Sequence, residues 1–280
     1  VAELRRSMME HGFLEITTPI LTCSSPEGAR DYLVPSRNHP GKFYALPQAP
    51  QQFKQLLMTS GFDRYFQIAK CFRDEDARAD RSPGEFYQLD MEMAFASQED
   101  VFAVLEDVLP PVFEKFGTYK TASKAPFCRI SYKDAMEKYG TDKPDLRIDL
   151  LVQDATECMA DCGFGPFEGN VVKAVVADGF KGTRKVIDKL CADVEVQSGN
   201  KAYWFKVDEN GSLTGGISKF LQERAETVKE ALGLKPGDFV GVCAGKKQAA
   251  QKTAGVLRRY IGAAGRGPYE DRLLRVLLGS

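Results

Sequence analysis

The sequence has little of several features that would narrow its function at once. It contains two histidines, and its formal net charge of −1 provides no overall attraction to nucleic acid, so any RNA contact depends on a local patch or on segments outside this chain. His11 and His39 are interpreted as surface turn residues rather than catalytic bases. No run of about 18 apolar residues and no signal-peptide pattern occurs. We therefore expect a cytoplasmic protein that makes no membrane contact.

The cysteines lack the spacing of a disulfide framework or a zinc ribbon. Their number is odd and no CxxC pair occurs. Cys158 and Cys162 would share one face of a helix, but no nearby histidine completes a metal-binding set. We expect no metal site in this chain and interpret the cysteines as buried thiols in a reducing cytosol. The seven are Cys23, Cys71, Cys128, Cys158, Cys162, Cys191 and Cys243.

Length and composition are those of a globular chain with about two domains. The 280 residues are 43% hydrophobic and 28% charged. The chain begins at Val1 inside a segment typical of a helix, so we expect the natural N-terminus to precede it. A change in character near Asp145 predicts a first domain over 1–145, a compact α+β module over 146–264 and an unassigned basic and apolar tail over 265–280.

Hydrophobic periodicity predicts the elements of each part. In the first part, helices are expected over 1–11, 51–60 and 98–116, the last interrupted near Pro110 and Pro111, and strands over 13–18, 43–46, 64–73 and 85–95. In the second part, strands are expected over 171–176, 202–207 and 239–242, and helices over 185–191, 217–232 and 246–261. The pairs Lys246–Lys247 and Arg258–Arg259 are interpreted as solvated helix faces.

The strand over 85–95 has two chemically different faces. Its alternation predicts one apolar face that packs on the core and one polar face that serves a ligand or partner. The apolar set is Tyr87, Leu89, Met91, Met93 and Phe95, and the other set is Phe86, Gln88, Asp90 and Glu92. The connection from the preceding strand, 74–84, is rich in charge and longer than the two to five residues of a tight hairpin, which favours a functional loop.

This strand–loop–strand unit contains the groups needed to hold a nucleotide. The planar guanidinium of Arg73 can neutralise a phosphate, Glu75 can accept from an exocyclic amine, and Phe86 can stack on a base. Carboxylates at Asp90 and Glu92 can bind an ammonium group, a metal or a ribose hydroxyl. Spacing alone leaves two alternatives open: a surface ion pair between Arg73 and Glu75, and a buried, hydrogen-bonded Asp90.

Four segments, in order, resemble the bacterial-type aspartyl-tRNA synthetases of class II. FRDEDARADR at 72–81 with EFYQLDME at 85–92 resembles motif 2, and GFLEITTP at 12–19 resembles motif 1. PEGARDY at 26–32 is similar to the mobile flipping loop, and ALPQAPQQFKQ at 45–55 to the aspartate-recognition segment. The resemblance implies an α+β fold: a mostly antiparallel class II sheet flanked by helices, with the module over 146–264 as the bacterial-type insertion domain.

The resemblance also implies an activity: ATP-dependent activation of L-aspartate to aspartyl-adenylate and its transfer to tRNA. The implied L-aspartate ligands are Glu27, Gln51, Lys54, Arg73, Gln88 and Asp90. The implied ATP ligands are Arg73, Asp74, Glu75 and Phe86, with Arg73 as the catalytic group. The implied partners are tRNA(Asp), with tRNA(Asn) left open, and a second copy in a homodimer whose interface includes Pro19. Mg²⁺ is expected with ATP, on ligands outside this chain.

The sequence departs from the family pattern in three respects. Ser82 stands where many relatives have Gln in the motif 2 loop, which puts an ATP contact there in doubt. Motif 3, a glycine-rich strand and helix ending in an ATP-binding Arg, is not recognised; 262–267 is a loose candidate without the right flanks. The N-terminal anticodon-binding barrel is also not recognised. We therefore expect this chain to carry only part of the active site.

Three alternatives remain. An asparaginyl or lysyl synthetase is disfavoured by Lys54 and the flipping-loop match, because a lysine pocket needs acids where this one offers a cation. A synthetase-derived asparagine synthetase is disfavoured by the inserted module and the long motif 2 loop. A truncated, catalytically inactive fragment that binds ligand or dimerises remains open.

Overall fold

The computed structural model describes residues 1–25, 28–75, 84–118, 122–265 and 277–279. Contacts divide the chain into two compact units, Val1–Pro126 and Phe127–Ser280. The residues just before the predicted boundary at Asp145 thus belong to the second unit, whereas the extent of the inserted module stays a prediction. Both units are α+β, as expected.

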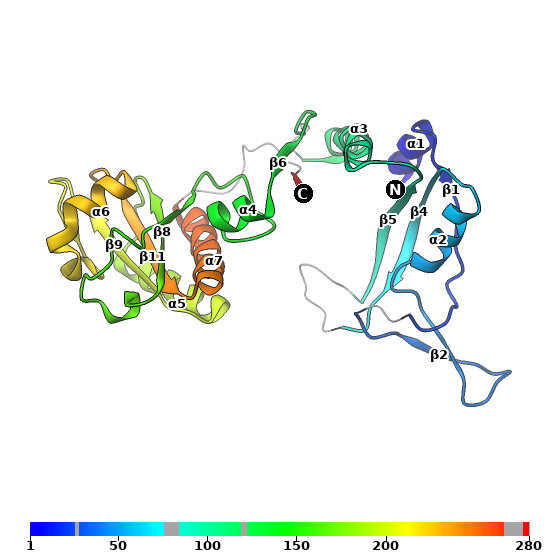
Figure 1. Cartoon of the computed structure of the whole chain (residues 1–280), viewed down its shortest axis with the longest axis horizontal. Helices are drawn as coiled ribbons and strands as arrows, with labels where there is room; N and C mark the ends of the chain where they lie inside the picture. Colours follow the sequence, from blue (N-terminus) through cyan, green and yellow to red (C-terminus); the bar gives the residue numbers. More distant parts are fainter. Residues whose placement is uncertain (26–27, 76–83, 119–121, 266–276, 280) are drawn as a thin grey trace. The chain divides into compact units, whose positions relative to one another are not determined.

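The first unit is built on a three-stranded sheet. Its elements are α1 (Ala2–Glu10), β1 (Leu14–Glu15), β2 (Leu33–Pro35), β3 (Phe43–Ala45), α2 (Gln51–Thr59), β4 (Arg64–Phe72), β5 (Glu85–Met93) and α3 (Gln98–Phe116), shown in Figure 1. The sheet order is β1-β4-β5, with β1 parallel and β5 antiparallel to β4. β2 and β3 form a separate antiparallel pair. The long β4–β5 ladder carries the predicted ligands Phe86, Gln88 and Asp90, and three more, Arg73, Asp74 and Glu75, follow the end of β4.

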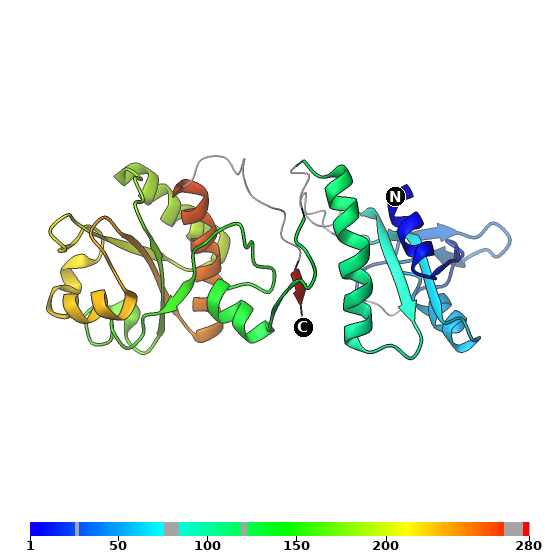
Figure 2. The same cartoon turned by 90° about the horizontal axis from the view of Figure 1, so that it is seen from above.

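The apolar face of the sheet packs on α1 and α3, which lie side by side in Figure 2. The core there consists of Met8, Phe13, Phe66, Val104 and Val108, with Leu89, Met91 and Met93 packed against it. The prediction for β5 is thus confirmed at its centre and wrong at its ends. Tyr87 is 64% exposed, and Phe95 is fully exposed because the strand ends at Met93.

Helix α3 is continuous across Pro110 and Pro111, so the predicted interruption is wrong. Each proline removes one backbone donor from the helix. Just before the two prolines, the buried side chains of Val104 and Val108 hold the helix against the core. A capping box at Ser97 and Asp100 fixes its start. Tertiary packing therefore outweighs the local cost of the prolines.

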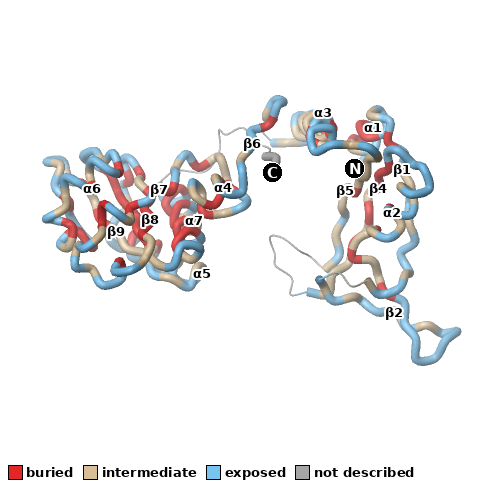
Figure 3. Tube along the Cα trace, in the orientation of Figure 1, coloured by how far each residue is buried: buried red, intermediate tan, exposed pale blue. Residues whose placement is uncertain are grey.

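The second unit contains a five-stranded antiparallel sheet of order β10-β9-β11-β8-β7. Its elements are β6 (Cys128–Ile130), α4 (Tyr132–Tyr139), β7 (Val152–Asp154), β8 (Val171–Ala177), α5 (Arg184–Ser198), β9 (Ala202–Val207), β10 (Leu213–Thr214), α6 (Ala225–Leu232), β11 (Phe239–Gly245), α7 (Lys247–Gly265) and β12 (Leu277–Gly279), with 3₁₀ turns at Gly165–Phe167, Ser218–Phe220 and Gln222–Arg224. Figure 3 shows the buried residues along β8, β9 and α7.

Both faces of this sheet are covered. One core includes Val175, Phe239 and Leu257 under α5 and α7, and the other includes Phe205, Val228 and Val240 under α6. In the tail, 277–279 pairs in parallel with β6, a partner that the sequence did not indicate. No helix among the described residues combines the length and apolar content needed to cross a membrane.

Arg258 is buried, so its interpretation as a solvated residue is wrong. It is 2% exposed and lies over the ring of Tyr139 at 5.0 Å. Its guanidinium donates to the carbonyl oxygens of Leu150 and Ile148, both at 2.5 Å, and of Asp145 at 3.0 Å. These bonds satisfy backbone acceptors in the irregular segment that leads into β7. The neighbouring Arg259 is exposed, as predicted.

We expect Arg258→Met to lower the free energy of unfolding of the second unit by about 3 kcal/mol or more, because it strands several buried acceptors. Arg259→Met is the matched control and should change it by less than about 0.5 kcal/mol. Urea unfolding followed by the fluorescence of Trp204, the single tryptophan, measures both. Equal effects of the two substitutions would contradict the structural role of Arg258.

Candidate functional site

The polar face of the β4–β5 ladder carries a buried ammonium group between two carboxylates. Lys54 comes from α2, and its Nζ lies 2.8 Å from Asp90 Oδ1 and 2.8 Å from Glu92 Oε1. Lys54 and Asp90 are 8% and 5% exposed. Asp90 and Glu92 are two residues apart on β5 and therefore point to the same side of the sheet. The structure thus brings together two predicted substrate ligands, Lys54 and Asp90, and a second acid, Glu92.

Charge balance explains why the ammonium group is stable in this position. Burial alone would lower the pKa of Lys54, but hydrogen bonds to Asp90 and Glu92 outweigh it, and the pKa is raised. An ammonium group has three donors, and two are used here. Asp90 Oδ2 is buried and has no hydrogen-bond partner among the described residues. One donor of Lys54 and one acceptor of Asp90 are therefore left for other groups.

Helix α2 turns a charged residue, rather than its apolar residues, towards the sheet. Pro47 and Pro50 precede its start, and the pattern of α2 predicts Phe53, Leu56 and Leu57 on one apolar face. The structure differs: Leu56 is 63% exposed, Phe53 and Leu57 are partly covered, and the buried residue of the helix is Lys54. The ion pairs with β5 therefore decide which side of α2 faces the sheet.

Gln48 is a site residue that sequence reasoning did not single out. It is 2% exposed, donates to Ala29 O at 2.8 Å and to Asp31 Oδ1 at 2.6 Å, and accepts from Ala29 N at 3.2 Å. The bond from Gln48 to Asp31, followed by one from Ser24, lowers the pKa of Asp31. Gln48 thus joins the recognition segment to the flipping-loop segment. Its position within the matched 45–55 segment is the one feature of the sequence that could have identified it. The predicted ligand Glu27 lies outside the described residues.

The predicted nucleotide end of the site is assembled around Arg73. Its guanidinium lies 5.0 Å from the ring centre of Phe86, and its backbone N–H donates to Gly84 O at 2.8 Å. Asp74 N donates to Arg30 O at 2.9 Å, and Arg30 Nε donates back to Asp74 O at 2.9 Å. The start of the motif 2 segment is therefore tied to the flipping-loop segment. The loop residues 76–83, including Ser82, lie outside the described residues.

The remaining predicted ligands lie around these two centres. Gln88 accepts a weak bond from Cys71 Sγ at 3.4 Å on the ladder face that carries Asp90. Gln51 lines a small pocket with Gln48 and Asp31. Glu75 is exposed. Within the described residues Arg73 and Glu75 form no ion pair with each other, so the surface-pair alternative finds no support.

Two further predictions concern the dimer interface and the cysteines. Pro19 is exposed, as are Leu14, Ile20 and Leu21, which lie near it in the sequence. No group of three or more His, Cys, Asp or Glu side chains among the described residues is arranged to hold a metal ion. Cys23 and Cys128 are exposed, so the interpretation of all the cysteines as buried is wrong for these two. Asp90 and Glu92 are already engaged with Lys54, and we assign no Mg²⁺ ligand in this chain.

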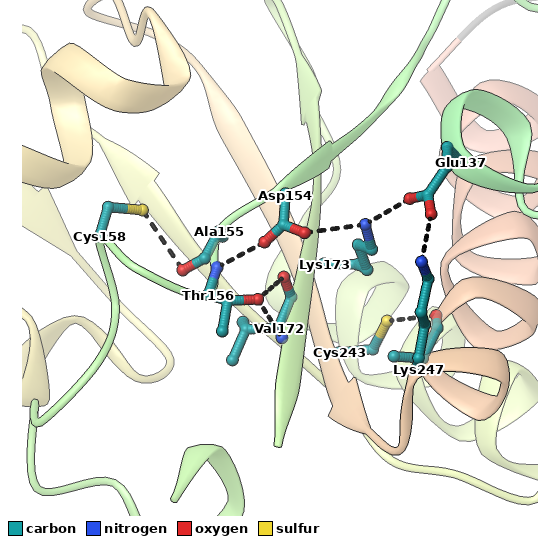
Figure 4. Close-up of polar contacts among 10 residues, drawn as sticks. Glu137, Asp154, Ala155, Thr156, Cys158, Val172, Lys173, Cys243 and Lys247 are labelled. Atoms are coloured by element: carbon teal, nitrogen blue, oxygen red, sulfur yellow. Dashed lines mark hydrogen bonds and ion pairs between the residues drawn. The ribbon is translucent and has the colours of Figure 1, made fainter. Parts of the chain in front are cut away.

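A second polar cluster lies in the other unit, in a pocket of about 720 Å³ (Figure 4). Lys173 on β8 is 3% exposed, and its Nζ lies 2.9 Å from Glu137 Oε2 and 3.0 Å from Asp154 Oδ2. Lys247 Nζ lies 3.0 Å from Glu137 Oε1. Hydrogen bonds from Lys173 and then Lys247 lower the pKa of Glu137 to about 2. These charges neutralise one another, so the cluster joins α4, β7, β8 and α7 and stabilises the unit.

We expect the stabilisation from Glu137 to depend on acid pH. Because its pKa falls from 4.5 to about 2 on folding, its contribution is complete above pH 4.5 and is lost as the pH falls towards 2. The difference in unfolding free energy between wild type and Glu137→Gln should therefore shrink over this range, measured by urea unfolding with Trp204 fluorescence. Glu157→Gln, in the same pocket but without an ion pair among the described residues, is the control. A pH-independent difference would contradict the assignment.

Comparison with known proteins agrees with the geometry of the first unit. Residues 1–249 match the family model described as tRNA synthetases class II (D, K and N). The chain is 54% identical to the aspartate–tRNA(Asp/Asn) ligase of Wolbachia sp. subsp. Drosophila simulans (strain wRi) and 56% identical to that of Zymomonas mobilis, each over 94% of this chain and 45% of the relative. It is 52% identical to the aspartate–tRNA ligase of Streptomyces avermitilis over 98% of this chain and 47% of the relative.

The chain spans about half the length of the curated relatives it matches. The match itself covers most of the chain and includes the β4–β5 ladder, α2 and much of the second unit. The resemblance inferred from the four sequence segments is thereby confirmed. The chain belongs to the class II tRNA synthetases of the aspartyl, lysyl and asparaginyl group.

Proposed function

We propose that this chain is part of an aspartate–tRNA ligase, which activates L-aspartate with ATP and transfers it to tRNA. The observation that carries the proposal is the buried ammonium of Lys54 on the polar face of β5, beside an acid with a free acceptor. The names of the relatives support aspartate as the amino acid. ATP use is expected for the family.

The remaining donor of Lys54 and the remaining acceptor of Asp90 match the side-chain carboxylate and the α-ammonium group of aspartate. The third donor of Lys54 can bind the side-chain carboxylate of the ligand, and Asp90 Oδ2 can accept from its ammonium group. Gln51, Gln88 and Glu27 would complete the amino-acid site. A neutral amide in place of the carboxylate would form a weaker bond to the cation, which favours aspartate over asparagine.

Arg73 would act at the reacting centre. The α-carboxylate of aspartate attacks the α-phosphorus of ATP, a carboxyl–phosphate bond forms, and pyrophosphate leaves with the electrons of the broken P–O bond. Arg73 would contact both the carboxylate and the α-phosphate, while Asp74, Glu75 and Phe86 hold the nucleotide. Such a site works by positioning and charge stabilisation rather than by a protein nucleophile.

The assembly around this site is part of the same proposal. We propose a homodimer with Pro19 in its interface, because the exposed apolar residues Leu14, Ile20 and Leu21 lie near it in the sequence. We propose tRNA(Asp) as the nucleic-acid partner, and tRNA(Asn) as a second partner on the names of two relatives. Mg²⁺ would accompany ATP on ligands outside this chain.

The test is calorimetric binding of a non-hydrolysable aspartyl-adenylate analogue to the 280-residue chain, with asparaginyl and lysyl analogues as controls. We expect selective binding of the aspartyl form. Lys54→Gln should weaken it by about 10-fold or more, because a hydrogen bond between charged groups is lost.

Lys70→Gln is the matched control for Lys54→Gln. Lys70 lies on β4 and pairs with Glu85 at 2.7 Å, away from Lys54. Its substitution should leave the affinity unchanged. Tighter binding of the lysyl or asparaginyl analogue, or equal binding of all three by a folded chain, would contradict an aspartate site.

A further inference from the structure

Two buried polar atoms of the first unit have no hydrogen-bond partner among the described residues: the hydroxyl of Tyr65 and Asp90 Oδ2. Tyr65 is fully buried on β4. In the ladder it stands opposite Glu92, and Gln67, two residues on, stands opposite Asp90. Tyr65 and Asp90 are therefore diagonal neighbours on one face, within reach of a long side chain.

An unpaired buried hydroxyl needs an explanation, because phenylalanine would fill nearly the same volume without an unpaired polar atom. Gln67, the other polar neighbour, has both ends of its amide engaged by Thr18, through Oε1 at 3.3 Å and Nε2 at 2.8 Å. The hydroxyl is a donor at neutral pH, since burial, with the negative charge of Asp90, raises the pKa of Tyr65. The acceptor that suits it is the free oxygen of Asp90.

Asp90 depends on Lys54 for its one described hydrogen bond to a side chain. A ligand carboxylate that draws Lys54 towards itself would weaken this bond. The buried carboxylate of Asp90 would then lack a donor to stabilise its charge. A neighbouring donor that moves onto the carboxylate would remove this penalty. Tyr65 is the donor in place to do so.

We propose that Tyr65 is a positioning residue of the amino-acid site, whose hydroxyl donates to Asp90 Oδ2 when Lys54 binds the ligand. Asp90 then keeps its place, and Oδ2, which has two lone pairs, accepts from both the Tyr65 hydroxyl and the ligand ammonium. This role rests on the proposed aspartate site. It assigns a function to a residue that lies outside the ligands inferred from the sequence.

The test compares wild type with Tyr65→Phe, by calorimetry with the aspartyl-adenylate analogue and by thermal unfolding. We expect about 10- to 100-fold weaker binding, the effect of losing one hydrogen bond to a charged group. The midpoint of unfolding should stay the same or rise, because the unpaired buried hydroxyl is removed. Tyr203→Phe, which removes a half-buried hydroxyl in the second unit, is the control and should change neither affinity nor selectivity.

A double-mutant cycle tests whether Tyr65 acts through Asp90. In an Asp90→Asn background, Tyr65→Phe should cause little further loss of affinity. Unchanged affinity of Tyr65→Phe, or a lowered unfolding midpoint that assigns the hydroxyl a structural role, would overturn the proposal. The wild-type chain separates the two hypotheses: no selective binding by wild type contradicts the aspartate site, whereas selective binding that Tyr65→Phe retains contradicts only the role of Tyr65.

Discussion

The need to neutralise a buried ammonium group governs the first unit. Lys54 is almost completely covered, so its charge requires partners, and Asp90 and Glu92 on alternate positions of β5 provide them. This requirement turns α2 so that Lys54 rather than Leu56 faces the sheet. The apolar face of the same sheet packs on α1 and α3. One face of the β4–β5 ladder therefore stabilises the unit, while the other concentrates charge.

Side chains from separated parts of the sequence hold the rest of the site against this ladder. Gln48 bonds the segment before α2 to Ala29 and Asp31, and Arg30 bonds the same loop to Asp74 at the end of β4. The predicted amino-acid ligands and nucleotide ligands are thus connected through one loop.

The second unit also contains buried cations that are satisfied by acceptors, and these stabilise its fold. Lys173 is buried between Glu137 and Asp154, and Arg258 donates to backbone carbonyls in an irregular segment. Neither role was predicted, because a lysine in a strand and an arginine in a basic helix stretch are typical of solvated faces. Their burial depends on acceptors far away in the sequence. Local sequence patterns therefore identified the helices and strands, whereas acceptors distant in the sequence decided which charged side chains are buried.

The sequence by itself determined the family, the α+β class, most element positions and the two faces of β5, because these depend on motifs and on short-range periodicity. Only the tertiary structure decided the pairing of Lys54 with Asp90 and Glu92, the hydrogen bonds of Gln48 and the continuity of α3 through its two prolines. It also decided that the Tyr65 hydroxyl and Asp90 Oδ2 have no hydrogen-bond partner in the described part of the chain. These features depend on distances between residues that the chain brings together only on folding. Burial, which sets the cost of each unpaired charge or hydroxyl, is a property of the packed molecule and not of any sequence segment.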